Sequence, residues 1–462
     1  MNGRRTGAAL AMPSGEELGR VRGTLPGTAS RSLGRRLAGV ESRNITRISA
    51  EGPIFWSAAR GANVQDADGN VYVDLTAGFA VAAAGHANAR VAAATGAQAA
   101  LLAHALGDVY PPDVKVSLLE RLAQLAPGDL GVSILASAGA EAVEAALKTA
   151  LLATGRPGVL AFTGAYHGLT YGALACTWRE EFRGPFAAQL NPGVRFAPYP
   201  YEYRWPGSGD VVAATLAAAR RIVAEAESSA MPIGCVLVEP IQGRGGIVVP
   251  PDGFLAGLRR LADERDLVLI FDEIYCGLGR TGRWWACEHE GVVPDVLLVG
   301  KALSGSLPLS AAIGARRVMD AWPPSPGEAM HTSTFLGNPV ACAAALAQLA
   351  EIEERGLVAR AAGLGALLRA RLDTWIGRRH SCVGEVRGRG LMQGVELVES
   401  GGRPARALAL RVADAALRRG VLLLGEGPDL NVLAFTPPLV ITEAQLDFAL
   451  DVVEEELERA TG

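Results

Sequence analysis

Residues 295–305 have the sequence DVLLVGKALSG, in which a lysine follows a strongly apolar run. The four apolar residues 296–299 predict a strand that is buried on both faces. Gly300 and Lys301 come directly after it. Either the strand has ended and Lys301 reaches water, or the fold places a desolvated, nucleophilic amine at a strand end. The rest of the chain favours the second explanation.

Continuous apolar runs alternate with helical patterns from about residue 130 to residue 305. GVSILAS (131–137) predicts a strand, and AEAVEAALKTALLATG (140–155) predicts a helix that Gly155 terminates. Further strands are expected in PGVLAFTG, PIGCVLVEPI and LVLIFDEI. Strands separated by helices imply crossover connections, so we expect an α/β fold with a mostly parallel sheet.

The two ends of the chain are expected to form a smaller lobe. Asp68-Gly69 lies between two alternating segments and predicts a hairpin turn. The start, MNGRRTGAALAMPSGEE, is only faintly like a signal peptide, because its apolar patch stops at Pro13, and a mobile arm is favoured. The expected parts are an N-terminal arm (1–45), a first part of the small domain (46–95), a large domain (96–340) and a second part of the small domain (341–462).

Composition excludes several classes of function. The chain has 462 residues and a net charge of −4, which gives no electrostatic case for binding nucleic acid or a membrane surface. Its apolar runs are too short to span a bilayer. The six cysteines are scattered without paired CxxC spacing, which predicts reduced thiols in a cytoplasmic protein and no metal site.

Polar residues follow several predicted strands, where ligands bind in open α/β sheets. These are Glu239 and Gln242, Asp272, and Lys301. The turn SAGAEA (137–142) opens a helix, and free N–H groups at such a turn can bind phosphate. Taken singly, each residue has a plain explanation as a cap or turn. Together they suit a phosphate, a ring nitrogen that needs a carboxylate and a carbonyl that needs an amine, which describes pyridoxal 5'-phosphate (PLP).

The chemistry of PLP explains the residue types. Lys301 would form a Schiff base with the cofactor aldehyde and later carry a proton between carbon atoms, for which burial and a lowered pKa are useful. Asp272 would keep the ring nitrogen protonated, which makes the ring an electron sink. Tyr166 and Ile274 are expected to cover the two ring faces. His167 is expected to order its loop rather than to act as an acid or base.

These motifs resemble those of class III (ornithine/GABA-type) aminotransferases of PLP fold type I, over residues 51 to 456. The similarity is carried, in chain order, by DADGNVYVDLTAGFAVAAAGHANARV, SAGAEAVEAALK, YHG, VEPIQGRGG, DEIYCGLGRTG, GKALSGSLPLSA, HTSTFLGNP and RGRGLMQGVEL. The resemblance implies a large domain whose mostly parallel sheet is wrapped by helices, and a smaller α+β domain built from both termini. It also implies amino-group transfer between an amine and a keto acid.

The resemblance assigns further roles to single residues. Gly139 and Ala140 would supply phosphate-binding N–H groups, and Gln242 would bond the phenolic oxygen of PLP. Thr334 would bind the phosphate of the partner subunit's cofactor, which implies an obligate homodimer with shared active sites. Phe79 would line the substrate entrance.

Four positions depart from the family pattern. Ala140 replaces the usual Ser or Thr of the phosphate turn, so one phosphate contact is lost or replaced. Leu169 stands where GABA-type members have an arginine after HG, and Ala434 replaces the arginine of their NVLR segment. Arg244 replaces the glutamate of QGEGG, so a cation stands where an anion is usual. Arg244 is either a solvated loop residue or the partner of an anion, namely a co-substrate carboxylate or a phosphate on the main substrate.

Loss of both usual arginines argues against GABA or ornithine as the main substrate, because an arginine is the natural clamp for a carboxylate. Amino sugars, polyamines and aryl-alkyl amines remain, and Glu239 could attract a polycation. The insertion YPYEYRWPG (199–207) is either a packed surface loop or a stacking platform for sugars. The chain is similar to the gentamicin/sisomicin-type C6′ aminotransferases of aminoglycoside biosynthesis.

Two other functions stay open on sequence grounds. One is a PLP-dependent eliminase, dehydratase, epimerase or aminomutase that needs no keto-acid acceptor. The other is a binding protein that keeps the fold without turnover, which the joint presence of Lys301, Asp272, Gln242 and Thr334 disfavours.

Overall fold

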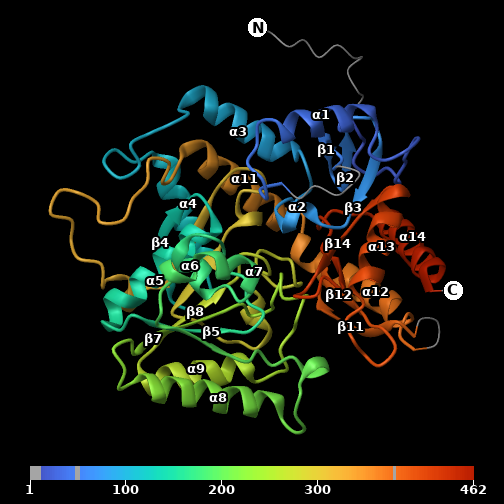
Figure 1. Ribbon diagram of the computed structural model, residues 1–462. Coiled ribbons are helices and arrows are strands. Elements are labelled where there is room, and N and C mark those ends of the chain that lie inside the picture. Colours follow the sequence, from blue (N-terminus) through green and yellow to red (C-terminus); the bar gives the residue numbers. More distant parts are fainter. Residues whose placement is uncertain (1–11, 47–52, 378–380, 462) are drawn as a thin grey trace.

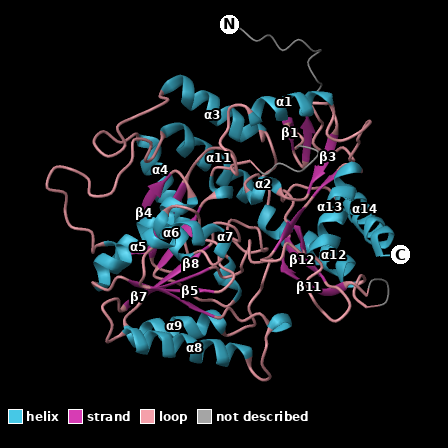
Figure 2. Cartoon of the chain, viewed as in Figure 1, coloured by secondary structure: helices cyan, strands magenta, loops and turns pink. Residues whose placement is uncertain are grey.

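The computed structural model describes residues 12–46, 53–377 and 381–461, and its centre is a seven-stranded sheet (Figures 1 and 2). The strands β6, β5, β7, β8 and β9 run parallel, whereas β10 is antiparallel to both β9 and β4. The mostly parallel α/β sheet expected from the sequence is therefore confirmed. In spatial order the strands are β4 (Leu130–Ala136), β10 (Ser310–Ala315), β9 (Val296–Val299), β8 (Val268–Asp272), β7 (Ile233–Val238), β5 (Gly158–Phe162) and β6 (Val194–Ala197).

Helices cover both faces of this sheet, which explains why its central strands are apolar without alternation. In Figure 1, α8 and α9 lie together on one side and α5 lies on the other. The described helices are α1 (Thr28–Ala38), α2 (Ala77–Ala80), α3 (Ala89–Leu101), α4 (Asp113–Leu125), α5 (Gly139–Thr154), α6 (Tyr171–Cys176), α7 (Glu180–Arg183), α8 (Val211–Ala226), α9 (Phe254–Arg265), α10 (Arg316–Met319), α11 (Pro339–Glu354), α12 (Leu357–Asp373), α13 (Arg406–Arg418) and α14 (Glu443–Thr461).

Helix α5 is positioned by small residues and by its two ends. Ala142, Ala145 and Ala146 are buried, and their size lets the helix lie close to the sheet. Gly155 adopts φ 66° and its N–H bonds the carbonyl of Leu151, so the predicted glycine stop is confirmed. The start of the helix follows β4 directly, which brings its free N–H groups to the carboxyl ends of the neighbouring strands.

Two smaller sheets lie beside the central one, and the first of them combines segments from both ends of the chain. Strand β13 pairs in parallel with β3, so residues near 71 and near 421 share one sheet. The Asp68-Gly69 turn joins β2 to β3, as predicted, with Gly69 at φ 84°. The first small sheet contains β1 (Trp56–Arg60), β2 (Asn63–Asp66), β3 (Val71–Asp74) and β13 (Val421–Leu422), and the second contains β11 (Val383–Arg389), β12 (Met392–Leu397), β15 (Val432–Phe435) and β14 (Leu424–Glu426).

The N-terminal segment packs on this lobe from residue 12 onward. Arg20 bridges to Val71, and Asp68 accepts hydrogen bonds from the backbone N–H groups of Ala29 and Ser30 at the start of α1. Part of the segment predicted as an arm is thus in contact with the small lobe, through Arg20 and the start of α1, and whether the arm moves stays a prediction. The prediction for residues 1–11 lies outside the described residues.

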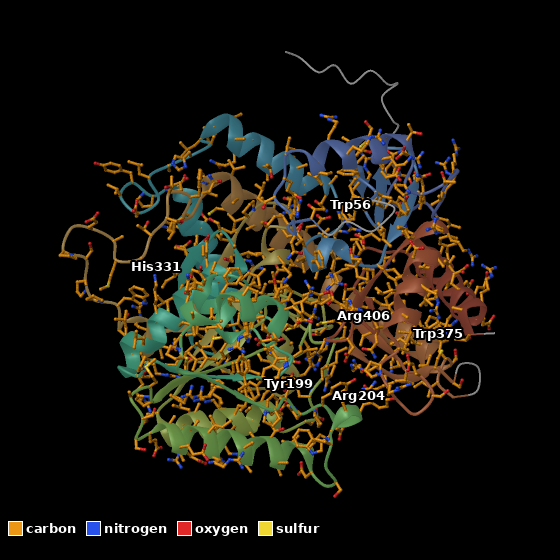
Figure 3. All side chains as sticks on the ribbon, in the orientation of Figure 1. Trp56, Tyr199, Arg204, His331, Trp375 and Arg406 are labelled. Carbon is orange, nitrogen blue, oxygen red and sulfur yellow. The ribbon has the colours of Figure 1, made fainter. Side chains whose placement is uncertain are left out.

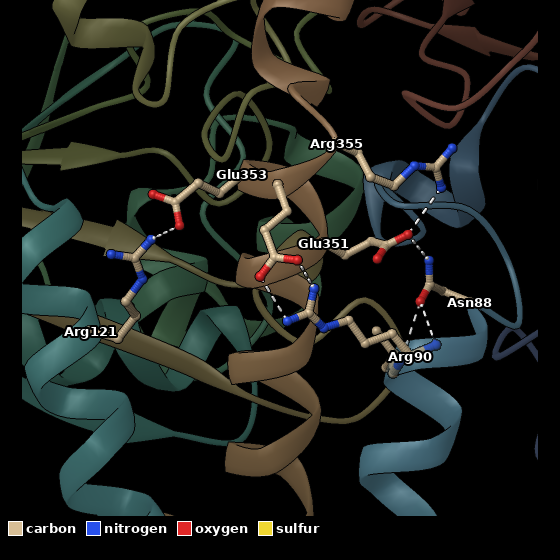
Figure 4. Close-up of polar contacts among 8 residues, drawn as sticks. Asn88, Arg90, Arg121, Glu351, Glu353 and Arg355 are labelled. Carbon is tan, nitrogen blue, oxygen red and sulfur yellow. Dashed lines mark hydrogen bonds and ion pairs between the residues drawn. The ribbon is translucent and has the colours of Figure 1, made fainter.

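Helix α11 is tied to α3 and α4 by charged residues at its C-terminal end (Figure 4). Glu354 forms two contacts with Arg90, at 2.5 and 2.9 Å, and Glu353 contacts Arg121 at 2.6 Å. Exposed ion pairs of this kind contribute little to stability because water screens them, so apolar burial holds the helices together. Within residues 12–46, 53–377 and 381–461, every helix is too short or too polar to cross a membrane.

Candidate active site

A cavity of about 370 Å³ lies beyond the carboxyl ends of β7, β8 and β9, at the start of α5. This is the usual place for a ligand in an open α/β sheet, and the volume suits a small cofactor with part of a substrate. The residues that line it are Gly139, Ala140, Tyr166, His167, Gly168, Leu169, Glu239, Arg244, Asp272, Ile274, Tyr275 and Lys301. Nine of the thirteen site residues expected from the sequence are in this set.

Lys301 presents its amine inside the cavity. It follows β9 with one glycine between, and its backbone adopts φ 43°, a left-handed conformation that is unusual for a residue with a side chain. Its Nζ lies 4.9 Å from the centre of the Tyr275 ring. Burial lowers the pKa of Lys301 below its ordinary value, although Asp272 and Glu239 favour the charged form. A larger share of neutral amine makes Lys301 a better nucleophile.

Asp272, the last residue of β8, is fixed by two hydrogen bonds. Its Oδ2 lies 2.7 Å from Nδ1 of His167, and its Oδ1 accepts the N–H of Ile274 at 3.1 Å. Both Asp272 and His167 are buried. The sequence assigned His167 only to the ordering of its loop, and its contact with Asp272 was missed because the two residues are 105 positions apart.

Glu239 ties together the two loops that carry Tyr166 and Arg244. Its carboxylate accepts the backbone N–H of Tyr166 and the backbone N–H of Gly243, each at 3.0 Å. Burial raises its pKa to about 7, although the neighbouring His167 opposes that change. The sequence suggested that Glu239 attracts a polycation, but both of its oxygens already hold the main chain.

The start of α5 forms the other end of the cavity. Gly139 and Ala140 line it, and the first N–H groups of a helix have no partner within the helix. Gly168 faces them with φ 123°, and a Cβ on Gly168 would lie 2.5 Å from that of Ala140. Only glycine fits at this position. Because Gly168 has no side chain, it does not cover the first N–H groups of α5, and these can bind an anion.

This donor set fits PLP. Asp272 suits a protonated ring nitrogen, Lys301 suits the aldehyde, and the amides of Gly139 and Ala140 suit the phosphate. Tyr166 and Ile274 are also in the cavity wall, where they could cover the ring. The combination of a buried carboxylate, a buried amine and open helix amides in one cavity is the observation that supports this fit.

Gln242 is not among the residues that line this cavity, and its bond to the phenolic oxygen of PLP stays a prediction. Its Nε2 donates to the carbonyl of Thr163 at 2.8 Å, and its side chain lines a second cavity of about 300 Å³. Tyr275 fills the wall of the catalytic cavity instead, packed so closely that a Cβ on Gly243 would lie 2.8 Å from its Cγ. The sequence placed Gln242 after a strand but could not show on which side of the turn its side chain would point.

The aromatic insertion also lies at the second cavity. Tyr199 and Arg204 line it and are labelled in Figure 3. Arg204 pairs with Glu396 of β12 at 2.5 Å, and the hydroxyl of Tyr201 bonds the same carboxylate. The insertion therefore packs against the C-terminal sheet, as a structural loop would, and does not line the catalytic cavity.

Three other predicted residues lie outside the cavity lining. Ala434 is buried in β15, and Thr334 is on an exposed loop, where its proposed role depends on a partner subunit. Phe79 is 45% exposed, and its ring centre lies 5.6 Å from Cζ of Arg244. Phe79 therefore lies next to Arg244, which lines the cavity, but does not line the cavity itself.

Arg244 is paired with an acid that the sequence did not reveal. Its Nε lies 2.9 Å from Oε2 of Glu426, which ends β14 and is 3% exposed. Burial raises the pKa of Glu426, and Arg244 and Arg179 oppose that rise. The sequence does not show that β14 pairs with β15, and it is this pairing that brings Glu426 beside the NVLA segment.

Comparisons with known proteins agree with this geometry. Residues 46–457 match the family model described as "Aminotransferase class-III". The 4-aminobutyrate aminotransferase of Mycobacterium tuberculosis (strain ATCC 25618 / H37Rv) is 40% identical over 443 residues, covering 93% of this chain and 96% of that protein. An (S)-enantioselective omega-transaminase from Thermomicrobium roseum superposes with a TM-score of 0.86 at 30% identity, covering 94% of this chain and 99% of that chain.

A third protein connects the fold with the cofactor. An amine transaminase from an uncultivated Pseudomonas species, in the PLP-bound form, has a TM-score of 0.84 at 30% identity, covering 91% of this chain and 99% of that chain. These matches extend over nearly the whole length and confirm the expected fold type, cofactor and enzyme class. The chain belongs to the class III aminotransferases, which use PLP.

Proposed function

We propose that this aminotransferase takes its amino group from a primary amine that has no carboxylate near the reacting carbon and passes it to a keto acid. The observation that carries the proposal is the wall of the cavity. Leu169 lines it, and Ala434 lies outside it, at the two positions where the family resemblance predicts arginines. Among the described lining residues, Lys301 and Arg244 are the cationic ones, and neither stands at one of the two usual arginine positions.

The residues of the cavity divide the work. When bound, PLP supplies a ring that accepts the electron pair left behind when a proton leaves the amine-bearing carbon. Lys301 is placed to take up that proton at Nζ and to return it, because burial favours its neutral form. Asp272, oriented by His167, is placed to hold a proton on the ring nitrogen. Glu239 keeps the loops of Tyr166 and Arg244 at a fixed separation.

An amino sugar of the aminoglycoside class, reacting at its C6′ amine or aldehyde, is our first candidate for the substrate. The support is the resemblance to that group of enzymes and the loss of the two usual arginines. Location in the cytoplasm remains a prediction from the cysteine pattern.

An ω-amino acid is the second candidate, and the relative from Mycobacterium tuberculosis favours it. 4-Aminobutyrate carries its amine at the end opposite its carboxylate, so it too lacks a carboxylate next to the reacting carbon. Arg244 could receive the distant carboxylate. The comparisons favour transamination over the elimination, epimerisation or mutase reactions that the sequence left open.

A homodimer completes the proposal, because Thr334 lies outside the cavity of its own chain. The loop between α3 and α4 and the loop before α11 contact each other, through Asn338 and Ala103 and through Thr332 and Asp108. Together they expose an apolar surface, the loop face, made of Leu101, Leu106, Val109, Tyr110, Met330 and Phe335. Such a surface suits a second copy of the chain.

A donor screen tests the proposed function. PLP-loaded enzyme is mixed with aminoglycosides, diamines, aryl-alkyl amines or ω-amino acids, and conversion of the cofactor to its amine form is followed by absorbance. Glutamate formed after addition of 2-oxoglutarate is then measured, with Lys301→Ala as the inactive control. A preference for carboxylate-free amines supports the first candidate, and a strong preference for an ω-amino acid rejects it.

A further inference from the structure

Two hydrogen bonds hold the backbone carbonyl of Arg244. Its carbonyl accepts Nη2 of Arg179 at 2.6 Å and the N–H of Gly427 at 3.3 Å. Arg179 also donates to the carbonyl of Gly427 at 2.8 Å. The loop that carries Arg244 is thereby joined to the turn that follows β14, so the side chain starts from a fixed point.

The side chain of Arg244 contacts Glu426 through Nε rather than through its terminal nitrogens. The distance between Nε and Oε2 of Glu426 is 2.9 Å. Among the described residues, no terminal nitrogen of Arg244 donates a hydrogen bond, and the contact between Nε and Glu426 is an ion pair without hydrogen-bond geometry. Arg244 lines the catalytic cavity. A guanidinium fixed through Nε keeps its two terminal N–H groups available for the bidentate contact that a carboxylate makes.

Two aromatic rings lie beside the guanidinium of Arg244. Cζ of Arg244 lies 5.2 Å from the ring centre of Tyr166 and 5.6 Å from that of Phe79. Phe79 is presented by a turn in which Ala77, Gly78, Phe79 and Ala80 all have positive φ, at 48°, 58°, 60° and 65°. Such backbone strain persists only where the surroundings enforce it, and it is frequent at functional sites.

We propose that Arg244 is the receptor for a carboxylate of the keto-acid co-substrate, oriented in advance by Glu426, Phe79 and Tyr166. The acid binds the terminal nitrogens while the Nε contact with Glu426 stays closed. The assignment rests on the proposed function in one respect, since it takes the acceptor to be a keto acid.

The charge of the pair explains how one cavity accepts two kinds of substrate. An unpaired Arg244 would repel an incoming ammonium group and would also disfavour the charged form of Lys301. Glu426 offsets that charge without covering the end of the guanidinium. The positive charge that an entering amine meets is then smaller, because Glu426 offsets part of the charge of Arg244 and Arg179, and the two terminal nitrogens of Arg244 stay available to a keto acid.

The test separates the two halves of the reaction. Arg244→Lys keeps the charge but removes the bidentate end, and Glu426→Gln keeps the shape but removes the anchor's charge. Each variant is mixed first with a carboxylate-free amine donor and then, in its amine form, with pyruvate or 2-oxoglutarate, by stopped-flow absorbance. Binding of glutarate, an unreactive dicarboxylate, is measured by calorimetry. Arg183→Lys is the matched control, because Arg183 also lies over a ring, that of Phe196, but outside the cavity.

We expect Arg244→Lys to raise KM for the acceptor at least tenfold, to weaken glutarate binding similarly, and to change the amine half-reaction less than threefold. If KM rises for 2-oxoglutarate alone, Arg244 binds the carboxylate that is distant from the keto group. If KM rises for pyruvate as well, Arg244 binds the carboxylate next to the keto group. Glu426→Gln should also raise KM with kcat little changed, although it removes a negative charge. Unchanged acceptor kinetics and glutarate binding in Arg244→Lys, or tighter acceptor binding in Glu426→Gln, would overturn the proposal.

The two proposals fail separately. If no carboxylate-free amine converts the cofactor, the proposed function fails, and glutarate binding still decides the role of Arg244. If carboxylate-free amines react well while glutarate binds Arg244→Lys as tightly as the natural enzyme, only the role of Arg244 fails.

Discussion

At the scale of the single residue, burial lowers the pKa of Lys301 and so increases its neutral, nucleophilic fraction. Its side chain enters a cavity in which the acids Asp272 and Glu239 favour its charged form, yet its pKa is still lowered. The folded protein therefore binds fewer protons at this residue than the unfolded chain does. Stability then rises with pH between the lowered pKa and the ordinary value of 10.5, so a charged Lys301 is a cost to the fold below that range.

Replacement of Lys301 by methionine should stabilise the cofactor-free protein. Lys301→Met removes a buried amine and keeps its length, so we expect Tm at pH 7 to rise by roughly 2 °C, with the gain shrinking as pH approaches 10.5. The measurement is thermal unfolding by circular dichroism at several pH values. Lys148→Met is the control, because Lys148 is exposed. A gain that is equal at pH 7 and pH 10 would contradict the argument.

Sequence reasoning located residues that directly follow a strand and missed those placed by a turn or by a distant contact. Lys301 and Asp272 are next to the ends of β9 and β8, so their position is fixed by strand geometry. Gln242 lies past a turn, where strand geometry does not fix its direction, and its Nε2 donates to the carbonyl of Thr163. Glu426 becomes visible only when β14 pairs with β15.

At the scale of elements, the start of α5 is the clearest link between local structure and function. Ala140 lines the cavity where the resemblance predicts a hydroxyl. Ala140→Ser should add one hydrogen bond to the phosphate and lower the Kd for PLP about three- to tenfold. Titration of the cofactor-free protein with PLP measures this. Ala140→Val adds bulk without a hydroxyl and should weaken binding, so an equal effect of both changes would reject the explanation.

The left-handed turn of residues 77–80 carries a measurable strain. Each residue with a side chain in this conformation costs about 1–2 kcal/mol, and the turn contains three of them. Gly78→Ala should destabilise the protein by about 1 kcal/mol. A Cβ at this position has space, since the nearest atom, in His86, would be 3.9 Å away, so the whole cost comes from the positive φ of the backbone.

Gly96 provides a control for that prediction within the same protein. It lies inside α3, and a Cβ there would meet nothing within 4 Å. Gly96→Ala should therefore stabilise the protein by about 0.5–1 kcal/mol. Chemical denaturation of both variants checks the pair. A stabilised Gly78→Ala variant would show that the turn is not strained.

The sequence predicted the central strands and the Asp68-Gly69 turn because apolar runs and turn residues specify them locally. It did not predict the contacts that Arg20 and the start of α1 make with the small lobe. Those contacts depend on main-chain pairing between Arg20 and Val71 and on Asp68 at the start of α1, and neither leaves an apolar pattern in the sequence.

At the scale of the whole molecule, the loop face predicts the state of assembly. We expect light scattering to give a mass near twice the 48.0 kDa of one chain. Val109→Asp places a charge on the loop face, where Val109 is 61% exposed, and should weaken the dimer and its PLP binding. Val40→Asp, at a residue 87% exposed after α1, should leave both unchanged. A natural enzyme that is monomeric and fully active would contradict the shared site.

The most direct test of the account is to find which lysine bonds the cofactor. The chain has three lysines, Lys115, Lys148 and Lys301, so a peptide map is unambiguous. Borohydride treatment of the PLP-loaded protein, followed by mass spectrometry, should place the reduced cofactor on Lys301 and nowhere else. Label on Lys115 or Lys148, or no label on a protein saturated with PLP, would contradict the assignment of this cavity as the active site.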